Sequence, residues 1–187
     1  MAIKQTYSPD EEDLSTTAEA FRKGSAEAFH ILYRKYHQKV YRFCLRMLGE
    51  EPLAKDAFQD TFIRVYENRK SFHGSNFAAW LFTIARHTCL NFIRARKDYD
   101  KLDEEVHGSV QYIRSDVGLQ NSISKAISML PLALREALVL REYEEYSYQE
   151  IADILSIDLS LAKVRVHRGR LLLRKMLEPV VKELNES

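Results

Sequence analysis

The stretch YSYQEIADILSIDLSLAKVRVHRGR, Tyr146–Arg170, contains start signals for two successive helices. Ser147 and Glu150 have the spacing of a capping box, in which each residue satisfies a free backbone N–H group of the other at a helix start. The apolar pattern then breaks over Ser156–Asp158, after which Ser160 is placed to cap a second helix. A short helix, a three-residue turn and a longer helix are the plan of a helix-turn-helix unit.

The polar face of this unit lies on its second helix. We expect it to end near Leu177, because Pro179 would interrupt the hydrogen-bond ladder. Ala152 on the first helix suits a close helix crossing, where a larger side chain would collide. A solvated basic helix in a bundle is the alternative, but the capping box, the small residue and the clustered cations favour DNA binding. The candidate DNA contacts are Ser160, Lys163, Val164, His167, Arg168 and Arg170.

The composition indicates a helical protein of one ordinary domain or two small ones. The chain has 187 residues, 45% of them hydrophobic, with 6 glycines and 4 prolines, so long continuous helices are expected. The formal net charge of +1 gives no overall sign of a nucleic-acid partner, so the local distribution of charge decides.

Nothing in the composition indicates secretion, membrane insertion or a cofactor. The first residues lack the apolar core of a signal peptide, and no apolar run approaches the ~18 residues of a bilayer span. Cys44 and Cys89 make no disulfide framework and are expected as small core residues in a reducing cytoplasm. His87 lies near Cys89, but no second ligand cluster has metal spacing, so no metal is expected.

The first half of the chain predicts three helices. Ser25 is placed to cap the first of them, and Gly49 is placed to end it in the left-handed conformation. Pro52 suits the first turn of the next helix. The expected helices cover 26–48, about 53–68 and 77 to about 97.

The second half begins with a charged, weakly periodic segment that indicates a linker. A new helical block begins near Leu119, and Pro131 starts a further helix within it. Since no convincing strand pattern occurs, the sequence predicts an all-α fold of two small helical domains. The predicted divisions are an acidic tail at 1–17, a first domain at 18–97, a linker at 98–118 and a second domain at 119–187.

Both blocks resemble conserved regions of bacterial sigma factors. Three stretches of the first block resemble the second conserved region: FHILYRKYHQKVYRFCLRMLG, AKDAFQDTFIRVY and FHGSNFAAWLFTIARHTCLNFIRARK. Two stretches of the second block resemble the fourth conserved region: LPLALREALVLREYEEYSYQEIADIL and VRVHRGRLLLRKML. The two regions stand in family order, with only a short linker where larger sigma factors carry a third region. This layout is that of the extracytoplasmic-function (ECF) sigma factors.

The resemblance implies a protein that is not an enzyme and needs no cofactor. Such proteins bind core RNA polymerase, direct it to promoters, open the minus-ten element and leave after initiation. Their fourth region reads the minus-thirty-five element, which the resemblance assigns to the candidate residues of the final helix. Core RNA polymerase and promoter DNA are therefore expected partners, and an anti-sigma factor is a third.

The resemblance also assigns two surfaces in the first domain. In the family, the helix at 53–68 binds a coiled coil of the largest polymerase subunit, and an acidic edge with apolar neighbours suits such a partner. The matching positions are Asp56, Gln59, Asp60 and Ile63. The next turn and helix match the segment that captures flipped minus-ten bases, where stacking contributes about 1–3 kcal/mol per base. The matching positions are Phe72, Ser75, Asn76, Phe77, Arg86, His87, Asn91, Arg94 and Lys97.

Some positions depart from the family pattern. Ser156 stands where glycine is usual, so the turn lacks easy access to positive φ. Ser160-Leu161-Ala162 replaces a common Gly-Thr-Val and Val164 a frequent serine, so the minus-thirty-five preference is not carried over. His87 replaces a common asparagine in the minus-ten segment, and Lys55 replaces a usual acidic residue on the polymerase-binding helix.

Other functions predict different features. A helix-turn-helix regulator acting without polymerase needs neither the docking face nor the base-capturing turn. A sigma-like decoy that sequesters an anti-sigma factor would have lost its DNA-facing residues, whereas Lys163, Arg168 and Arg170 remain. An enzyme is the least expected, because the sequence has no P-loop, HExxH motif or nucleophile elbow.

Overall fold

The computed structural model describes residues 9–74, 76–100 and 119–185. Over these residues the chain is helical and forms no strand, so the predicted all-α fold is confirmed. The elements are α1 (Pro9–Arg22), α2 (Ala26–Leu48), α3 (Glu51–Glu67), the 3-10 turn η1 (Arg69–Ser71), α4 (Phe77–Asp100), α5 (Leu119–Met129), α6 (Leu132–Glu142), α7 (Tyr148–Leu155) and α8 (Leu159–Asn185).

The helix ends predicted in the first half are confirmed. The Ser25 hydroxyl accepts a hydrogen bond from the backbone N–H of Ala28, at 3.2 Å, and so caps α2. Gly49 ends α2 with φ 76°, and its N–H donates to the carbonyl of Leu45. Pro52 lies in the first turn of α3, where a missing N–H costs no intrahelical bond.

The helix α1 differs from the prediction of a tail at 1–17, because it begins at Pro9. Proline is compatible with a first helical turn, and tertiary packing supplies the stability that its sequence pattern does not indicate. Phe21 at the far end of α1 is fully buried, and its ring centre lies 5.7 Å from those of Phe29 and Phe77. The packing of this ring fixes α1 to the rest of the bundle.

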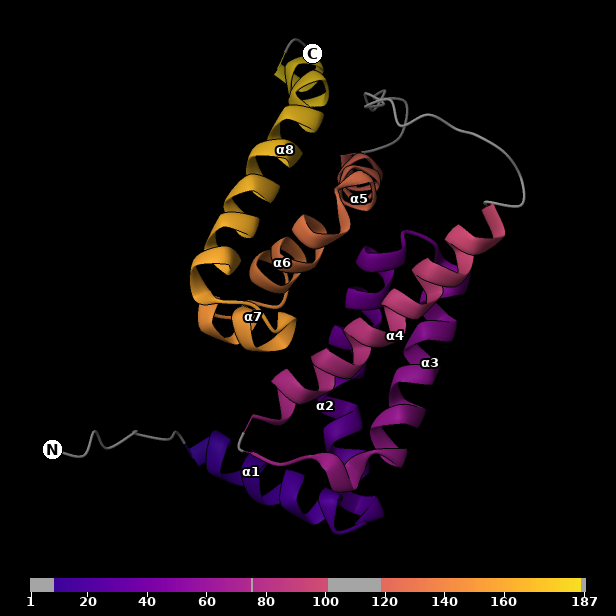
Figure 1. Cartoon of the computed structure of the whole chain (residues 1–187), viewed down its shortest axis with the longest axis vertical. Helices are drawn as coiled ribbons and strands as arrows, with labels where there is room; N and C mark the ends of the chain where they lie inside the picture. Colours follow the sequence, from indigo (N-terminus) through magenta and orange to yellow (C-terminus); the bar gives the residue numbers. More distant parts are fainter. Residues whose placement is uncertain (1–8, 75, 101–118, 186–187) are drawn as a thin grey trace, which may run out of the picture.

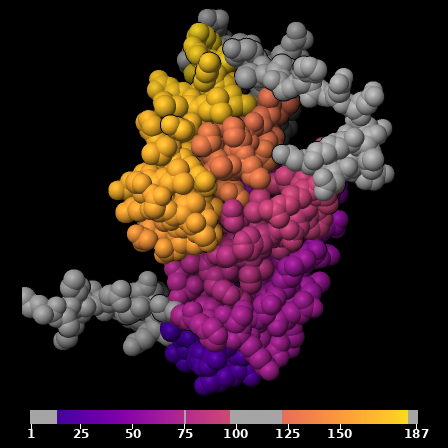
Figure 2. Space-filling model, in the orientation of Figure 1, coloured from indigo at the N-terminus to yellow at the C-terminus, as the bar shows by residue number. Residues whose placement is uncertain are grey.

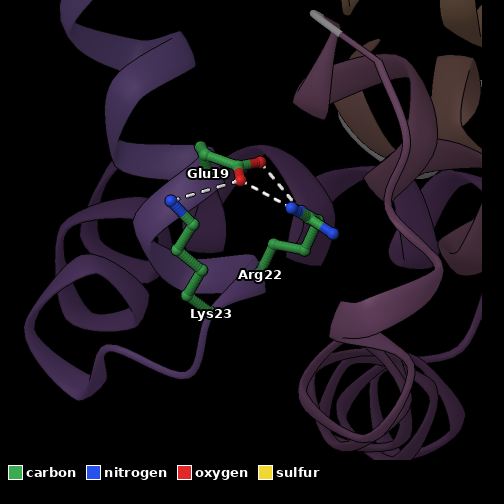
Figure 3. Close-up of polar contacts among 3 residues, drawn as sticks. All are labelled: Glu19, Arg22 and Lys23. Carbon is green, nitrogen blue, oxygen red and sulfur yellow. Dashed lines mark hydrogen bonds and ion pairs between the residues drawn. The ribbon is translucent and has the colours of Figure 1, made fainter.

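The last turn of α1 carries an ion cluster on its surface (Figure 3). Both carboxylate oxygens of Glu19 accept hydrogen bonds from Arg22, at 2.6 and 2.8 Å, and Lys23 Nζ lies 3.6 Å away. The hydrogen bond from Arg22 lowers the pKa of Glu19 to about 2. Arg22 in the last turn and Lys23 directly after it also interact favourably with the negative end of the helix dipole, which favours an ordered end of α1.

The described helices form two groups, α1–α4 and α5–α8, which lie side by side (Figure 1). Helix α7 packs against α4, and α5 and α6 pack against α2. In the space-filling view the surfaces of the two groups meet directly (Figure 2). The contact between the two groups, α4 with α7 and α2 with α5 and α6, forms a seam. The buried core is continuous across this seam, and the rings of Phe82 on α4 and Tyr146 lie 5.3 Å apart there. Helix α4 reaches Asp100, past the predicted boundary, and the rest of the predicted linker lies outside the described residues.

The predicted helix-turn-helix unit is confirmed as α7 and α8. Ser147 and Glu150 form the capping box, since each accepts a hydrogen bond from the other's backbone N–H. Ala152 is 2% exposed, as expected at a close crossing. The turn differs from the expectation at Ser156, which adopts φ 54° although it is not glycine. The turn therefore keeps the left-handed backbone conformation, which has a steric cost for a residue with a side chain.

Both predicted ends of α8 are wrong. Asp158 rather than Ser160 caps the start, because its Oδ1 accepts the backbone N–H of Leu161 at 2.8 Å. The far end continues through Pro179 to Asn185. Val180 is 3% exposed and belongs to a buried cluster with residues of α5 and α6. Its burial offsets the hydrogen bond that proline cannot donate.

Both thiols are core residues, as predicted. Cys44 on α2 and Cys89 on α4 are free and fully buried. Among the helices of the described residues, none combines the length and apolar character that a bilayer span needs.

Candidate nucleic-acid and partner-binding surfaces

The outward face of α8 is open to solvent over two turns. Ala162 and Val166 are fully buried and fix which side of the helix faces inward. Positions three and four apart share a side of a helix, so the remaining residues form one surface. Its exposed members are Lys163, Val164, His167 and Arg168.

Two other predicted residues of α8 are held by carboxylates. Arg170 pairs with Glu142 of α6, with 2.5 Å between Nη2 and Oε1. Ser160 donates its hydroxyl hydrogen bond to Asp158, within the cap of the helix. Both residues stay exposed, so they lie at the edges of the same face.

The predicted docking residues of α3 lie on the outer surface of the first group. Asp56, Gln59 and Ile63 are exposed, and Asp60 is half-buried. Ile63 keeps 55% of its surface in solvent, which is unusual for an isoleucine. The four side chains therefore combine two carboxylates with an unpartnered apolar group.

An aromatic groove of about 540 Å³ adjoins these residues. It lies between α2 and α3, and Ile63 and Gln59 form part of its lining. The rings of Tyr33 and Phe62 pack edge to face in its floor, with centres 4.8 Å apart. The groove was not predicted from the sequence, although the aromatic residues at positions 29 and 33 of α2 are a signal for it. The aromatic lining consists of Phe29, Tyr33, Phe58, Phe62 and Tyr66.

The predicted minus-ten turn precedes α4. Asn76 caps this helix, because its Oδ1 accepts the backbone N–H of Ala79 at 2.9 Å. Its Nδ2 also donates to Glu150 of α7, at 3.2 Å. Ser75 lies outside the described residues. Asn76 is thus positioned at the seam between the two groups, where α7 already contacts it.

The two predicted aromatic contacts, Phe72 and Phe77, are core residues in this structure. They are 4% and 5% exposed, and their ring centres lie 5.6 Å apart. Trp80 packs against both rings. The turn folds these rings under α4 because burying them removes a large apolar area from water. Their faces therefore offer no stacking surface in this conformation.

The polar residues of α4 fall into two classes. Arg86 forms a buried ion pair with Glu136 of α6, with 2.9 Å between Nε and Oε1. Burial, together with the neighbouring charge of Arg86, lowers the pKa of His87. His87, Asn91 and Arg94 are exposed, and the side chain of Lys97 lies outside the description. Only part of the predicted strand-binding face is therefore free.

A buried carboxylate at the seam was not anticipated. The Glu144 side chain is 1% exposed and lies 3.9 Å from Arg46 of α2. Within the described part of the chain, neither of its oxygens has a hydrogen-bond partner. The guanidinium of Arg46 lies 3.7 Å from the ring centre of Tyr143. The segment between α6 and α7 thus places an aromatic and an acidic side chain on α2.

Comparisons with known proteins agree with this arrangement. The Sigma-70 region 2 family matches residues 32–99, and the Sigma-70, region 4 family matches residues 120–173. The ECF RNA polymerase sigma factor SigW of Bacillus subtilis is 37% identical over 172 residues, covering 83% of this chain and 92% of SigW. RNA polymerase sigma factor YlaC of the same organism is 33% identical, covering 80% of this chain and 91% of YlaC.

Solved structures show the same fold. The sigma factor RpoE of Bartonella quintana, in complex with the anti-sigma factor NepR, superposes with a TM-score of 0.69 at 26% identity. That match covers 82% of this chain and 98% of RpoE. CnrH, in complex with the cytosolic domain of CnrY, has a TM-score of 0.70 at 21% identity, covering 88% and 97% of the two chains.

The region 2 match lies within the first helical group, α1–α4, and the region 4 match lies within the second, α5–α8. We refer to the two groups as region 2 and region 4. Two region matches in order and a relative that is aligned over nearly its whole length agree on one family. The chain belongs to the ECF RNA polymerase sigma factors, which are not enzymes and which bind core polymerase and direct it to promoters.

Proposed function

We propose that this sigma factor uses three separate surfaces to start transcription. The α3 face and its aromatic groove bind core RNA polymerase, the outer face of α8 reads the minus-thirty-five duplex, and α4 with the preceding turn holds the minus-ten strand. The observation that carries the proposal is the joint exposure of an acidic–apolar face on α3 and a cationic face on α8. A helix-turn-helix regulator acting without polymerase has no use for the first of these.

The polymerase surface combines Ile63 and the groove with the carboxylates of Asp56 and Asp60. Apolar anchors in a groove contribute most of the energy of an interface, and the charges at its edge set orientation and rate. Asp60→Arg should abolish co-purification with core polymerase, and Ile63→Ala should weaken it at least about tenfold. Glu178→Arg, the same charge reversal on an exposed part of α8, is the control and should bind normally. Full retention of Asp60→Arg would remove α3 from the interface.

The duplex surface rests on Lys163 and Arg168, which are exposed and lie about 1.4 helical turns apart. Each lost phosphate contact lowers the slope of log affinity against log salt by about 0.9, and each lost base contact costs about 1–3 kcal/mol. Lys163→Ala and Arg168→Ala should weaken binding to promoter duplex at matched salt. Lys182→Ala removes a cation from the far end of α8 and should change nothing. Equal loss in all three variants would contradict a localised reading face.

The minus-ten surface uses Asn76, Arg86, His87, Asn91 and Arg94, with Ser75 and Lys97 assigned from their sequence positions. Phe72 and Phe77 support the turn from within instead of stacking on bases. Permanganate footprinting should reveal unpaired thymines only when polymerase and this protein are both present. Arg94→Ala should reduce the footprint without reducing polymerase binding. A bubble formed by polymerase alone would contradict the assignment.

We also propose an anti-sigma factor as a partner and the cytoplasm, where core polymerase works, as the location. The support is the fold shared with RpoE, which was solved with the anti-sigma factor NepR. The two domains extend over α1–α4 and α5–α8, with 101–118 as the linker. Purification of the tagged protein from its host, followed by mass spectrometry, should recover polymerase subunits and one further stoichiometric protein.

A further inference from the structure

Val164 is an exposed apolar side chain at the centre of the outward face of α8. It keeps 41% of its surface in solvent. A helix turns by about 100° per residue, so Val164 lies about 160° round the axis from both Ala162 and Val166, which are two residues to either side. Those two residues are fully buried. Val164 therefore points almost directly away from the core of region 4.

The rotation of α8 about its own axis is fixed by a close contact with α6. Gly169 is buried, and a Cβ on it would lie 3.3 Å from the carbonyl oxygen of Leu134. Arg170 also pairs with Glu142 of α6. A helix held at such short range cannot turn another side outward without breaking this packing. The outward position of Val164 is therefore a property of the fold.

Two cations lie on either side of Val164. Lys163 lies about 100° round the helix in one direction and Arg168 about 40° in the other, and both are exposed. Long cationic side chains on the two sides of a helix can reach the negative phosphates at the edges of a DNA groove. The residue between them then faces the base edges on the groove floor. The charge pattern therefore matches a duplex groove with Val164 at its floor.

The chemistry of Val164 restricts what it can recognise. A valine side chain has no hydrogen-bond donor or acceptor with which to read a base. The hydroxyl of Ser160, about one turn earlier on the same face, already donates to Asp158. In the major groove the base pairs present hydrogen-bonding atoms and one distinctive apolar group, the C5-methyl of thymine. Apolar contact with this methyl group is the means by which an aliphatic side chain distinguishes one base from the others.

We propose that Val164 is a specificity-determining residue that recognises the 5-methyl group of one thymine in the minus-thirty-five element. The inference rests on the proposed assignment of the α8 face to that duplex. The contact buries a methyl group that water otherwise surrounds. Removing this group should lower affinity about fourfold, which corresponds to about 0.8 kcal/mol.

Uracil substitution tests this contact, because uracil differs from thymine only by the absence of the methyl group. Core RNA polymerase carrying the full chain selects duplexes from a randomised pool, and each thymine of an enriched duplex is then replaced by uracil in turn. Replacement at one minus-thirty-five thymine should lower the affinity of the wild type about fourfold. With Val164→Ala the same replacement should have no effect. This coupling between side chain and methyl group separates direct contact from a change in DNA shape.

Two further variants calibrate the result. Val181→Ala is the matched control, because Val181 is 49% exposed on the same helix but lies about 25 Å further along it. It should show the wild-type response to uracil. Val164→Thr keeps one of the two methyl groups of the valine and should retain part of the response. A response to uracil that is the same in Val164→Ala as in Val181→Ala would overturn the proposal.

Two patterns of result separate this contact from the proposed function. If polymerase with this protein enriches no sequence beyond those that polymerase alone enriches, the proposed function fails and the thymine contact fails with it. If sequences are enriched but no uracil replacement depends on Val164, only the thymine contact is overturned. If Val164→Ala instead lowers the recovery of polymerase, Val164 is a protein contact, which also overturns the proposal.

Discussion

Asp158 caps α8: its Oδ1 accepts the backbone N–H of Leu161 across 2.8 Å. The hydroxyl of Ser160 also donates to this carboxylate, and these bonds lower the pKa of Asp158. Lys163 lies about 1.4 turns beyond the cap. The carboxylate therefore fixes the first turn of α8, the helix that we propose reads duplex DNA.

Replacing the cap should affect both stability and DNA binding. Asp158→Ala should lower the midpoint of thermal unfolding by about 2–4 °C, the usual result of losing one helix cap in a chain of this size. Asp158→Asn keeps an acceptor oxygen and should lose less. Ser160→Ala leaves the bond to Leu161 intact and serves as the comparison. If calorimetry showed a larger drop in the unfolding midpoint for Ser160→Ala than for Asp158→Ala, the result would contradict the assignment of Asp158 as the cap.

The turn of the helix-turn-helix unit stores strain at one residue. Ser156 has φ 54°, a region that costs an L-residue roughly 1–2 kcal/mol. Ser156→Gly removes this cost but loses about 0.5–1 kcal/mol through the greater freedom of the unfolded chain. Urea unfolding should therefore show a net gain of about 0.5 kcal/mol. Glu145→Gly, at φ 60°, should change stability in the same direction. A loss in both would show that the strain is absent.

The left-handed glycine at the end of α2 is also a contact between the regions. Gly49→Ala adds a Cβ at φ 76° and 3.0 Å from the Cβ of Ser128 on α5. Backbone strain alone should cost about 1–2 kcal/mol in urea unfolding. Gly24→Ala adds similar strain at φ 102°, but its Cβ would meet only Arg69, at 3.9 Å. Only Gly49→Ala should also increase amide exchange of α5, and equal exchange in both variants would contradict the close approach.

The buried carboxylate of Glu144 makes the fold dependent on pH. Burial raises the pKa of Glu144 above its usual 4.5, although Arg46, Lys39 and Arg42 of α2 oppose the rise and Glu145 adds to it. A pKa that is higher in the folded than in the unfolded state means that the folded state binds the proton more tightly. This stabilisation is complete below the unfolded pKa and is lost as the pH rises through the folded pKa.

Glu144→Gln removes this dependence. Relative to the variant, the wild type should lose stability as the pH rises from below 4.5 through the raised pKa of the folded state. Urea unfolding of both proteins across this range measures the difference, and all other titrating groups cancel in it. Glu67→Gln, at an exposed position of α3, is the control. If the free energy of unfolding of the wild type increased relative to that of Glu144→Gln as the pH rises, the result would contradict an unfavourable buried charge on Glu144.

Local signals in the sequence predicted most of the fold. The cap at Ser25, the glycine at position 49 and the capping box at Ser147 each satisfy backbone groups within four residues, so a short window contains the evidence. The continuation of α8 through Pro179 could not be predicted in this way. It depends on the burial of Val180 against α5 and α6, which no local pattern reveals.

The binding surfaces were predicted less completely, because the exposure and pairing of their residues depend on residues that are far away in the sequence. The exposure of Lys163 and Arg168 follows from helix periodicity alone. Arg86 and Glu136 are separated by 50 positions, so their pairing depends on how the two regions pack. Phe77 was assigned to DNA by its position in the family motif, and its burial follows from the fold of the turn around Phe72.

Reconstituted transcription on a genomic DNA library tests the central claim most directly. Core RNA polymerase with the wild-type protein should initiate at a restricted set of promoters that polymerase alone does not use. The same reaction with Asp60→Arg should return to the pattern of polymerase alone, while Glu178→Arg should match the wild type. Initiation that is identical with and without the wild-type protein would contradict the account.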